Sequence, residues 1–355
     1  YLVEAQYLWS VAGTPQVYHS ISLSTTSATF DNTRINVMYN GSASGGYSNR
    51  MSSIFNVNSA TTFSHAQGNS SIASGRYSHA EGETTLASGS NSHAEGFFTI
   101  SSGSFSHAEG VETQAIGQCS HAEGDGTQAI GVASHAEGNT TIASGSYSHA
   151  EGTGSISLGL SSHAEGAFTL AKGDYSHAEG FLSTSSGIFS HAEGRNNKAS
   201  GSYSHAEGFQ SIALGDYSHA EGSGDALGTY SHAEGSGTAT GALSHAEGSE
   251  TIAIGQGSHA EGQGTISSGS YQHASGKYNT HGDDTSLFIV GNGTADGSRS
   301  DAFKVRMSGS IVMPTTQSIA PAWTGVDGEI VPATVGGVYS LYMWMNGNWR
   351  SSSFS

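Results

Sequence analysis

The chain has 355 residues, a net charge of −18 and only 11% charged residues, with 51 glycines, 4 prolines and one cysteine, Cys119. The glycines follow no Gly-X-Y period, which excludes collagen, and charges are too scarce for a disordered polyelectrolyte. The acidic balance gives no attraction to nucleic acid or anionic lipid, and no apolar run approaches the ~20 residues of a membrane span, so we expect neither a nucleic-acid partner nor membrane insertion.

The first region, residues 1–63, is rich in Ser, Thr, Asn, Tyr and Val. Short stretches alternate between polar and apolar residues, as at 34–39, and this period of two is typical of β-strands. We therefore expect a β-rich connector at this end of the chain.

The second region, residues 64–276, is a repeat array. The pentapeptide Ser-His-Ala-Glu-Gly occurs fourteen times without substitution, and degenerate copies at 64–68 and 272–276 flank the series. The histidines are fourteen residues apart, except for two thirteen-residue steps that lead to His232 and His245. So rigid a period indicates one small structural unit stacked on copies of itself, which predicts a β-solenoid shaft.

One repeat, residues 204–217, contains two related heptads of the form small–x–Ala–x–Gly. Each heptad can form one short strand of five residues, and each glycine marks a sharp turn where φ can be positive. Because side chains alternate along a strand, His205 and Glu207 point one way and Ala206 the other. The equivalent second-strand position, such as Ala213, holds only Ala or Ser in the coils from residue 73 to residue 171, which indicates a cramped interior. Coils ~4.8 Å apart predict a shaft on the order of 70 Å.

The third region, residues 277–355, has a different composition. Strands are predicted at 287–290 and 302–307, and 340–350 is typical of a hairpin on an Asn-Gly turn. Near this end we expect aromatic side chains that could contact a glycan, in competition with a packing role. These residues are Tyr339, Tyr342, Trp344 and Trp349.

The outward His and Glu of the repeat predict an interface between chains. So thin a coil buries too little apolar surface to offset its chain entropy, and one outer face must therefore be covered. Self-association would cover the invariant face, which carries His and Glu, with identical copies. A column of glutamates requires donors, for which we expect a His–Glu–Ser hydrogen-bond layer at every coil, most stable with ionised Glu and weaker near pH ~4. The predicted ladder consists of His79, Glu81, His93, Glu95, His107, Glu109, His121, Glu123, His135, Glu137, His149, Glu151, His163, Glu165, His177, Glu179, His191, Glu193, His205, Glu207, His219, Glu221, His232, Glu234, His245, Glu247, His259 and Glu261.

Other readings of these residues remain open. Three symmetry-related histidines on an axis could hold a metal ion, but recurrence at every coil favours a lattice element, so we expect no metal and no cofactor. The His, Glu and Ser of the motif are also the ingredients of a hydrolase triad, but fourteen equal copies do not make one preorganised site, so we expect no catalytic residue. Threonines such as Thr84, Thr99, Thr113 and Thr127 do not form the flat Thr-x-Thr rows of an ice-binding surface.

The pattern Ser-x-Ala-x-Gly, twice in fourteen residues, resembles the head repeats of YadA-type trimeric autotransporter adhesins; 211–215 and 251–255 match it closely. That resemblance implies a left-handed parallel β-roll that trimerises about its long axis. The Ser-His-Ala-Glu-Gly version, with His and Glu where the adhesin has aliphatic residues, resembles repeats of bacteriophage tail fibres, and 288–294, 300–305 and 341–350 are similar to segments of such fibres. The resemblance covers about three quarters of the chain.

Together these observations predict an all-β, homotrimeric β-roll shaft without enzymatic activity. We expect a bacteriophage tail fibre, extracellular as part of the virion, that attaches to the host surface by multivalent contacts. Its expected partners are its own copies, other tail or appendage proteins, and a glycan or protein receptor on the bacterial surface. The alternative is a bacterial trimeric surface adhesin.

Overall fold

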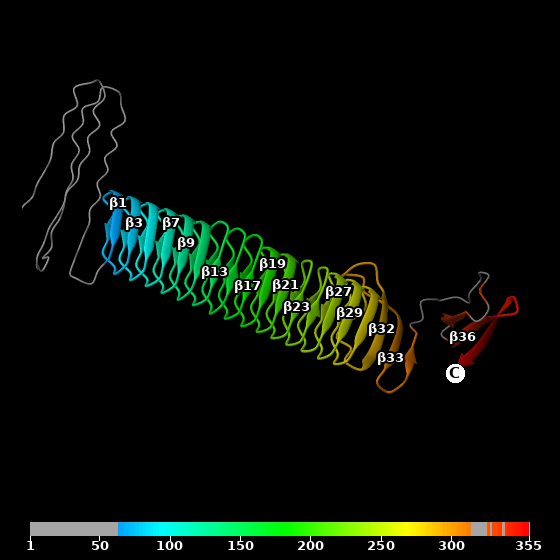
Figure 1. The fold of residues 1–355 in the computed structure, drawn as a ribbon. Coiled ribbons are helices and arrows are strands. Elements are labelled where there is room, and N and C mark those ends of the chain that lie inside the picture. The colour runs from blue at the N-terminus through cyan, green and yellow to red at the C-terminus, as the bar shows by residue number, and fades with distance from the viewer. Residues whose placement is uncertain (1–62, 314–324, 327–328, 336–337, 355) are drawn as a thin grey trace, which may run out of the picture.

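The computed structural model describes residues 63–313, 325–326, 329–335 and 338–354. In this part of the chain every regular element is a β-strand, and none is a helix, so no helix here could cross a membrane. Most of the strands form one long stack of coils (Figure 1). The expected all-β solenoid is therefore confirmed. The expected connector at 1–63 lies outside the described residues, apart from Phe63.

Each coil of the stack contributes one strand to each of two sheets. The 19-stranded sheet contains β1 (His65–Asn69), β3 (His79–Glu83), β5 (His93–Phe97), β7 (His107–Val111), β9 (His121–Asp125), β11 (His135–Asn139), β13 (His149–Ala150), β15 (His163–Ala164), β17 (His177–Ala178), β19 (His191–Arg195), β21 (His205–Phe209), β23 (His219–Ala220), β25 (His232–Ala233), β27 (His245–Ser249), β29 (His259–Gln263), β31 (His273–Lys277), β32 (Ser286–Asn292), β33 (Asp301–Arg306) and β34 (Ile311–Val312).

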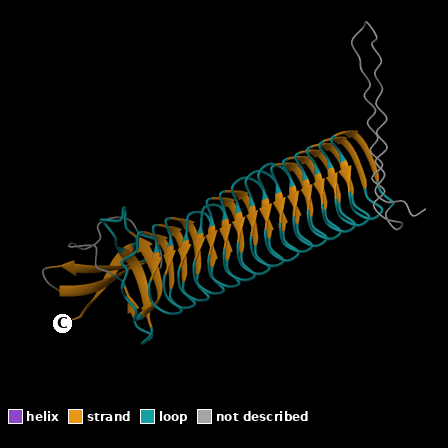
Figure 2. Ribbon diagram, turned by 90° about the vertical axis from the view of Figure 1, so that its left-hand side faces the viewer, coloured by secondary structure: helices purple, strands orange, loops and turns teal. Residues whose placement is uncertain are grey.

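The second sheet has 15 strands, all of two residues. They are β2 (Ile72–Ala73), β4 (Leu86–Ala87), β6 (Ile100–Ser101), β8 (Gln114–Ala115), β10 (Gln128–Ala129), β12 (Ile142–Ala143), β14 (Ile156–Ser157), β16 (Leu170–Ala171), β18 (Thr184–Ser185), β20 (Lys198–Ala199), β22 (Ile212–Ala213), β24 (Asp225–Ala226), β26 (Thr238–Ala239), β28 (Ile252–Ala253) and β30 (Ile266–Ser267). The expected five-residue second strand is therefore wrong in length. Figure 2 shows the turns along the edges of the stack.

Strands of successive coils pair in parallel and in register. His79 pairs with His93 and Glu81 with Glu95, and the same register continues from coil to coil along the array. Each residue of the repeat therefore stands directly above its own equivalent. Identical side chains form columns along the rod, which makes the one-dimensional repeat a set of parallel rows on its surface.

The interior of the repeat array is filled mostly by small side chains. Ala80 and Ala87, one from each sheet, are completely buried, and their equivalents form the core along the array. Ser78 and Thr85 are also buried, because they lie two residues before these alanines and share the inward face. The hydroxyl of Ser78 donates to the carbonyl of Gly75 at 2.8 Å, so the buried polar group is satisfied within its own turn.

The two glycines of a repeat serve different purposes. At Gly82 φ is +115°, and a Cβ would stand 2.0 Å from the carbonyl oxygen of the equivalent glycine in the next coil. At Gly89 φ is not positive, yet a Cβ would stand 1.9 Å from the next carbonyl oxygen. The left-handed turn residues are instead Tyr77 and Thr84, with φ of 58° and 57°. The expectation that both glycines need positive φ is therefore wrong for the second, which is required by close packing of coils.

The two thirteen-residue steps are absorbed in two successive turns. One residue is missing between Gly222 and Asp225, where Gly224 donates its N–H to the carbonyl of Glu221 at 3.1 Å, and one between Gly235 and Thr238, where Gly237 donates to Glu234 at 3.1 Å. The strands on either side keep their register, with His219 paired to His232. A deletion at a corner therefore leaves the columns of both sheets intact.

The stack continues beyond the expected boundary at residue 276. Strand β32 pairs in parallel with β31, with His273 opposite Phe288, and adds a further layer to the first sheet. Strand β33 then turns back antiparallel to β32, and β34 pairs with β33. These strands confirm the predictions at 287–290 and 302–307, but they extend the solenoid instead of starting a separate region.

Polar side chains close the end of the stack. Gln272 replaces the serine of the motif, and its buried amide donates to the carbonyls of Asp283 and Ser286 at 2.7 and 2.8 Å. Lys304 lies 2.7 Å from Asp301 and 3.3 Å from Asp283, and the Asp301 side chain is only 3% exposed. This cluster satisfies groups that another coil would otherwise cover.

Three further strands form a separate antiparallel sheet, β35 (Ile330–Val335), β36 (Val338–Met345) and β37 (Asn348–Phe354). The turn between β36 and β37 contains Asn346 and Gly347, both with positive φ, of 50° and 75°. The predicted Asn-Gly hairpin is confirmed, since a two-residue turn of this kind needs positive φ at both central positions.

Candidate functional site: the histidine–glutamate ladder

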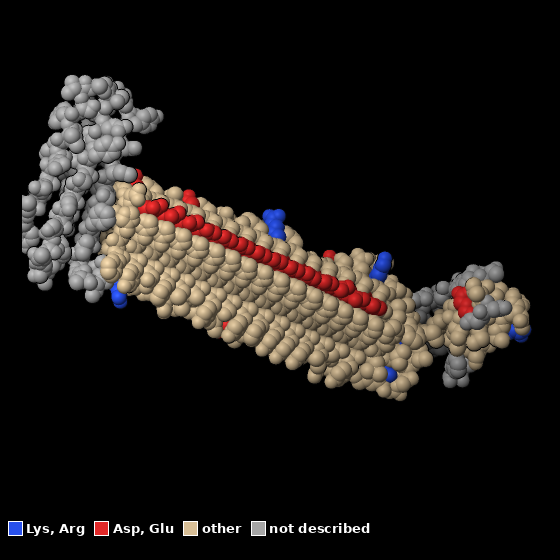
Figure 3. Space-filling model, viewed as in Figure 1, with Lys and Arg blue, Asp and Glu red and all other residues tan. Residues whose placement is uncertain are grey.

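The His and Glu of the motif lie on the outer surface of the first sheet. They alternate with the buried alanine between them, and in-register pairing converts each into a column along the rod. Figure 3 shows the carboxylates as a continuous acidic stripe over the length of the array. The predicted ladder thus exists as a surface of one chain, with His and Glu side chains about one-third exposed, for instance 34% at His177 and 30% at Glu179.

The imidazoles form an ordered stack. From His79 to His259 neighbouring rings lie 4.6–4.9 Å apart with interplanar angles of 1–8°. Burial, followed by the neighbouring imidazoles, lowers the pKa of most of these histidines, and it lowers the pKa of His245 to about 4. Protonated rings at this spacing would repel each other, so the histidines with a lowered pKa favour the uncharged form.

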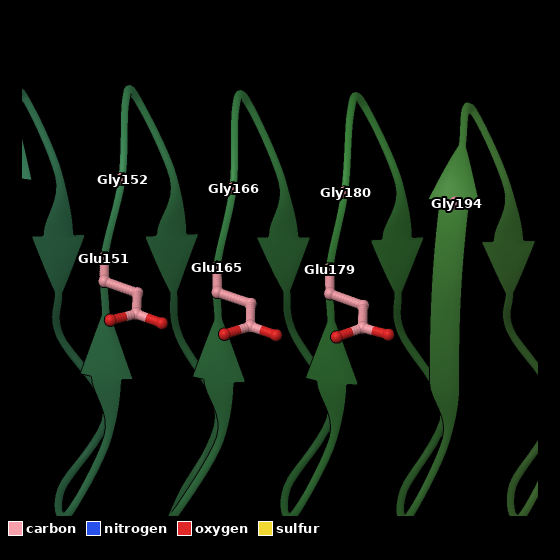
Figure 4. A pocket seen from close by; sticks show the side chains of 7 residues that line it. All are labelled: Glu151, Gly152, Glu165, Gly166, Glu179, Gly180 and Gly194. Atoms are coloured by element: carbon pink, nitrogen blue, oxygen red, sulfur yellow. The ribbon is translucent and has the colours of Figure 1, made fainter.

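The glutamates form a second column beside the first. In Figure 4 the carboxylates of Glu151, Glu165 and Glu179 follow one another along the rod, each with one oxygen directed toward the next coil. A hydrogen bond to Glu165 is the main cause that raises the pKa of Glu179 to about 8. The hydrogen bond to Glu179 is in turn the main cause that lowers the pKa of Glu165 to about 2.

The alternation continues along the column. Hydrogen bonds to neighbouring carboxyls raise the pKa of Glu123 and of Glu151 to about 7, while the pKa values of Glu137 and Glu193 are lowered by the same bonds. The direction of the pKa shift therefore alternates from coil to coil over these glutamates. Coupled titration of neighbouring carboxyls, in which one retains a proton beside an ionised partner, reduces the repulsion between like charges at this spacing.

Each imidazole also contacts carboxylates. Nε2 of His177 lies 3.6 Å from Oε1 of Glu165 in the preceding coil and 3.9 Å from Oε2 of Glu179 in its own coil. These separations exceed hydrogen-bond length, and Nε2 is inaccessible to solvent and has no hydrogen-bond partner. The His–Glu part of the expected layer is therefore an electrostatic contact.

The expected participation of serine in this layer is wrong. Ser176 and His177 are adjacent residues, so their side chains point to opposite faces of the strand, and Ser176 is 2% exposed inside the coil. In other coils the equivalent hydroxyl donates to a turn carbonyl, as Ser190 does to Gly187 at 2.7 Å. The same geometry separates the Ser of the motif from its His, so the motif does not assemble a Ser–His–Glu triad within its coil.

A shallow open groove follows the glutamate column. Its floor is formed by the glutamates and the glycines that follow them, including Glu151, Glu165, Glu179, Gly166 and Gly180. A second stretch of the same groove continues past Glu207 and Glu221. The groove exists because each of these glycines lacks a side chain beside the carboxylate.

The threonines considered as an ice-binding row lie elsewhere. Thr99, Thr113 and Thr127 are completely buried between the sheets, and Thr127 donates to the carbonyl of Glu123 at 3.1 Å. Only Thr84 of that group lies at an exposed corner. These side chains therefore pack the interior and do not form a surface array.

The predicted glycan-contact residues lie on the C-terminal hairpin. Trp344 and Trp349 are cross-strand partners whose rings pack edge to face, with centroids 5.3 Å apart, and both are partly exposed. Tyr342 is also partly exposed, while the side chain of Tyr339 lies outside the described residues. The glycan role of these residues stays a prediction.

Aromatic residues at one corner form a column that the sequence only suggested. The rings of Tyr175, Phe189, Tyr203, Tyr217 and Tyr230 stack at 4.7–5.1 Å, and each ring is about half exposed. In the sequence, the recurrence of aromatic residues just before the motif was the feature that indicated such a column. Since their faces cover one another, it is the ring edges that reach the surface, which leaves little face for a sugar to stack on.

The comparison with known proteins agrees with this geometry. The YadA head domain repeat model matches residues 66–92, 122–148, 150–176, 206–224 and 246–271, all within the stack of coils. A search of curated proteins finds no match. The matched segments contain both strands and both turns of the coil, so the repeat array of this chain is similar to the YadA head domain repeat.

Proposed function

We propose that the chain is the rigid shaft of a homotrimeric attachment fibre. The observation that carries this proposal is that small side chains fill the interior of the rod while large apolar side chains lie on its surface. The interior is filled by Ala, Ser and Thr, whereas many large apolar side chains are exposed, among them Phe105, Tyr147 and Leu243 at 54–65%. A rod with so thin a core gains stability when its surface is covered by identical rods.

The ladder is the proposed seam between the three chains. It is the face whose residues do not vary from coil to coil, and it presents uncharged imidazoles beside carboxyls that already share protons. Such a face can approach a copy of itself without opposing a full column of like charges. The second sheet, by contrast, carries a mixed outer row that includes Ile156, Leu170, Lys198 and Asp225.

An arginine substitution on each face tests the seam. Glu165→Arg with Glu179→Arg should convert the trimer to monomers, measured by sedimentation velocity, because bulk and charge are added at the seam. Ile156→Arg with Leu170→Arg adds the same groups to the opposite sheet and should leave the trimer intact. Circular dichroism verifies that both variants keep the β-roll. The reverse pattern, or a monomeric parent chain, would reject the proposed seam.

For the biological setting we propose a bacteriophage tail fibre that binds a bacterial surface glycan or protein and contacts other tail proteins. The support is the resemblance of the Ser-His-Ala-Glu-Gly repeats and of the segments after them to phage fibres. A bacterial trimeric adhesin is the second candidate, favoured by the match to YadA head repeats. Immunogold labelling with antibody to the array separates them, since virions should be labelled in the first case and the surface of phage-free cells in the second.

We also infer that the array has no catalytic role. Its groove is open and repeats in equal copies, whereas catalysis needs one preorganised pocket. The separation of Ser and His onto opposite faces supports this inference. Hydrolysis of a panel of esters and glycosides by the full chain, abolished by substitution within the ladder, would contradict it.

A further inference from the structure

Three histidines in the middle of the ladder, His163, His177 and His191, each lie between two carboxylates of one chain. Nε2 of His163 is 3.7 Å from Oε1 of Glu151 and 4.0 Å from Oε2 of Glu165. Nε2 of His177 is likewise flanked by Glu165 and Glu179, at 3.6 and 3.9 Å. Each glutamate thus directs one oxygen to the histidine of its own coil and the other to the histidine of the next.

The imidazole nitrogen in this arrangement lacks a partner. Nε2 of His163, His177 and His191 is shielded from solvent and makes no hydrogen bond. It faces carboxylate oxygens that bear lone pairs of their own. Three donor atoms, one nitrogen and two oxygens, therefore converge at each of these three histidines. Sets of two histidines and one glutamate overlap with them, such as His163, Glu165 and His177, whose ligand atoms lie within 4.8 Å of one another.

We propose that the middle of the ladder is a row of divalent transition-metal sites at His163, His177 and His191, each formed by one imidazole nitrogen and two carboxylate oxygens from successive coils. Ligand atoms around a tetrahedral zinc ion with bonds of ~2.0–2.1 Å stand ~3.4 Å apart. The separations of 3.6 and 3.9 Å at His177 reach this value when the glutamate side chains move by a few tenths of an ångström. The mixed nitrogen and oxygen set selects zinc, cobalt or nickel over calcium and magnesium.

Repulsion between ions sets their number. Neighbouring sites share Glu165 or Glu179. Dications in adjacent coils, spaced by the ring distance of 4.8 Å at His163 and His177, repel each other strongly. The two outer sites, at His163 and His191, are therefore filled at saturation, which gives about two ions per chain.

This inference goes beyond the proposed function and does not depend on it, because all three ligands come from one chain. It also revises the expectation of no metal. That expectation considered three histidines brought together on a symmetry axis, whereas the in-register coils bring His and Glu of one chain together at every layer.

Zinc binding to the full chain tests the proposal. The protein is stripped with EDTA, dialysed at pH 7.5 against zinc ions, and assayed by atomic emission for bound metal, with the expected result of about two ions per chain. The variant His163→Gln, His177→Gln, His191→Gln removes the nitrogen ligand of all three sites and should bind less than half as much zinc. A matched control changes the exposed glutamates outside the ladder, Glu83, Glu112 and Glu250, to Gln and should bind as the parent does.

Cobalt and calcium provide a second readout. Cobalt(II) should give visible absorption bands of nitrogen and oxygen ligation that the histidine variant lacks, and calcium should bind much more weakly than zinc. If the histidine variant loses its β spectrum, Glu137→Gln, Glu165→Gln and Glu193→Gln replace it as the test. Fewer than one zinc per chain, equal calcium binding, or unchanged capacity in the ladder variant would overturn the proposal. Sedimentation velocity of the same samples measures the oligomeric state, so the result for metal binding is read independently of the result for the proposed trimer.

Discussion

Replacing a second-heptad glycine in the middle of the rod should break the stack at one point. In Gly145→Ala the new Cβ would stand 1.9 Å from the carbonyl oxygen of Gly159, about 1.5 Å short of the 3.4 Å at which ordinary contact begins. An opening of this size separates the N–H groups of Ser144 and Gly145 from the carbonyl of Ser157, which they now reach at 2.9 and 3.3 Å. Losing two backbone hydrogen bonds and the adjacent packing should cost about 2–4 kcal/mol.

The measurement is urea unfolding followed by circular dichroism, with hydrogen exchange to locate the break. Because each coil contacts only its neighbours, we expect exchange to rise around residues 143–159 and the two flanking blocks to unfold less cooperatively. The matched control is Gly126→Ala. Its φ is +65° and its new Cβ would lie 3.3 Å from a methyl group of Thr140. The equivalent positions carry Glu112 and Thr140, so the substitution should cost only the backbone strain of about 1 kcal/mol and should leave the coils in contact. Equal stability of Gly145→Ala and the parent would refute the packing argument.

Two further predictions concern charge. Glutamates with raised pKa, at about 7 for Glu123 and Glu151 and about 8 for Glu179, stabilise the fold fully below the unfolded pKa near 4.5 and lose this contribution as pH rises through 7–8. In EDTA the melting temperature should therefore fall from pH 6 to pH 9, and replacing these three glutamates by Gln should reduce the fall. The off-ladder control Glu83→Gln, Glu112→Gln, Glu250→Gln should follow the parent. If the ladder variant and the parent have parallel pH profiles, the raised pKa values of the glutamates are contradicted. Lys304→Met leaves the carboxylate of Asp301, which is 3% exposed, without its cationic partner at 2.7 Å. The substitution should lower the free energy of unfolding in urea by about 3–5 kcal/mol, and adding Asp301→Asn should restore part of the lost stability. An unchanged unfolding midpoint would show that the cluster does not stabilise the end of the rod.

The sign of the pH effect was not accessible from the repeat alone. Sequence reasoning treated each glutamate as an ionised group with His and Ser donors, and so expected weakening only in acid. In the structure Ser176 points inward, and Glu165 and Glu179 are each other's hydrogen-bond partners. Loss of stability in base follows from that pairing, which depends on the vertical distance between coils and not on any residue within one coil.

The roles of the two glycines were likewise predictable from the sequence only in part. A small residue at Gly82 or Gly89 could be predicted to mark a turn, because both follow an alternating strand. That Gly89 is required by the carbonyl of the next coil, with ordinary φ, depends on how tightly coils approach. The strands at 286–292 and 301–306 were likewise predictable, but their addition to the stack depends on β32 pairing with β31.

Periodicity within the chain by itself determined the solenoid, the inward alanines and the outward His and Glu, since a fixed fourteen-residue repeat with alternating side chains permits few other arrangements. Only the tertiary structure decided which neighbours those side chains meet. Parallel in-register stacking places every group next to its own copy one coil away, so the chemistry of the surface, with its shared protons and its converging donor atoms, arises between repeats that are identical in sequence.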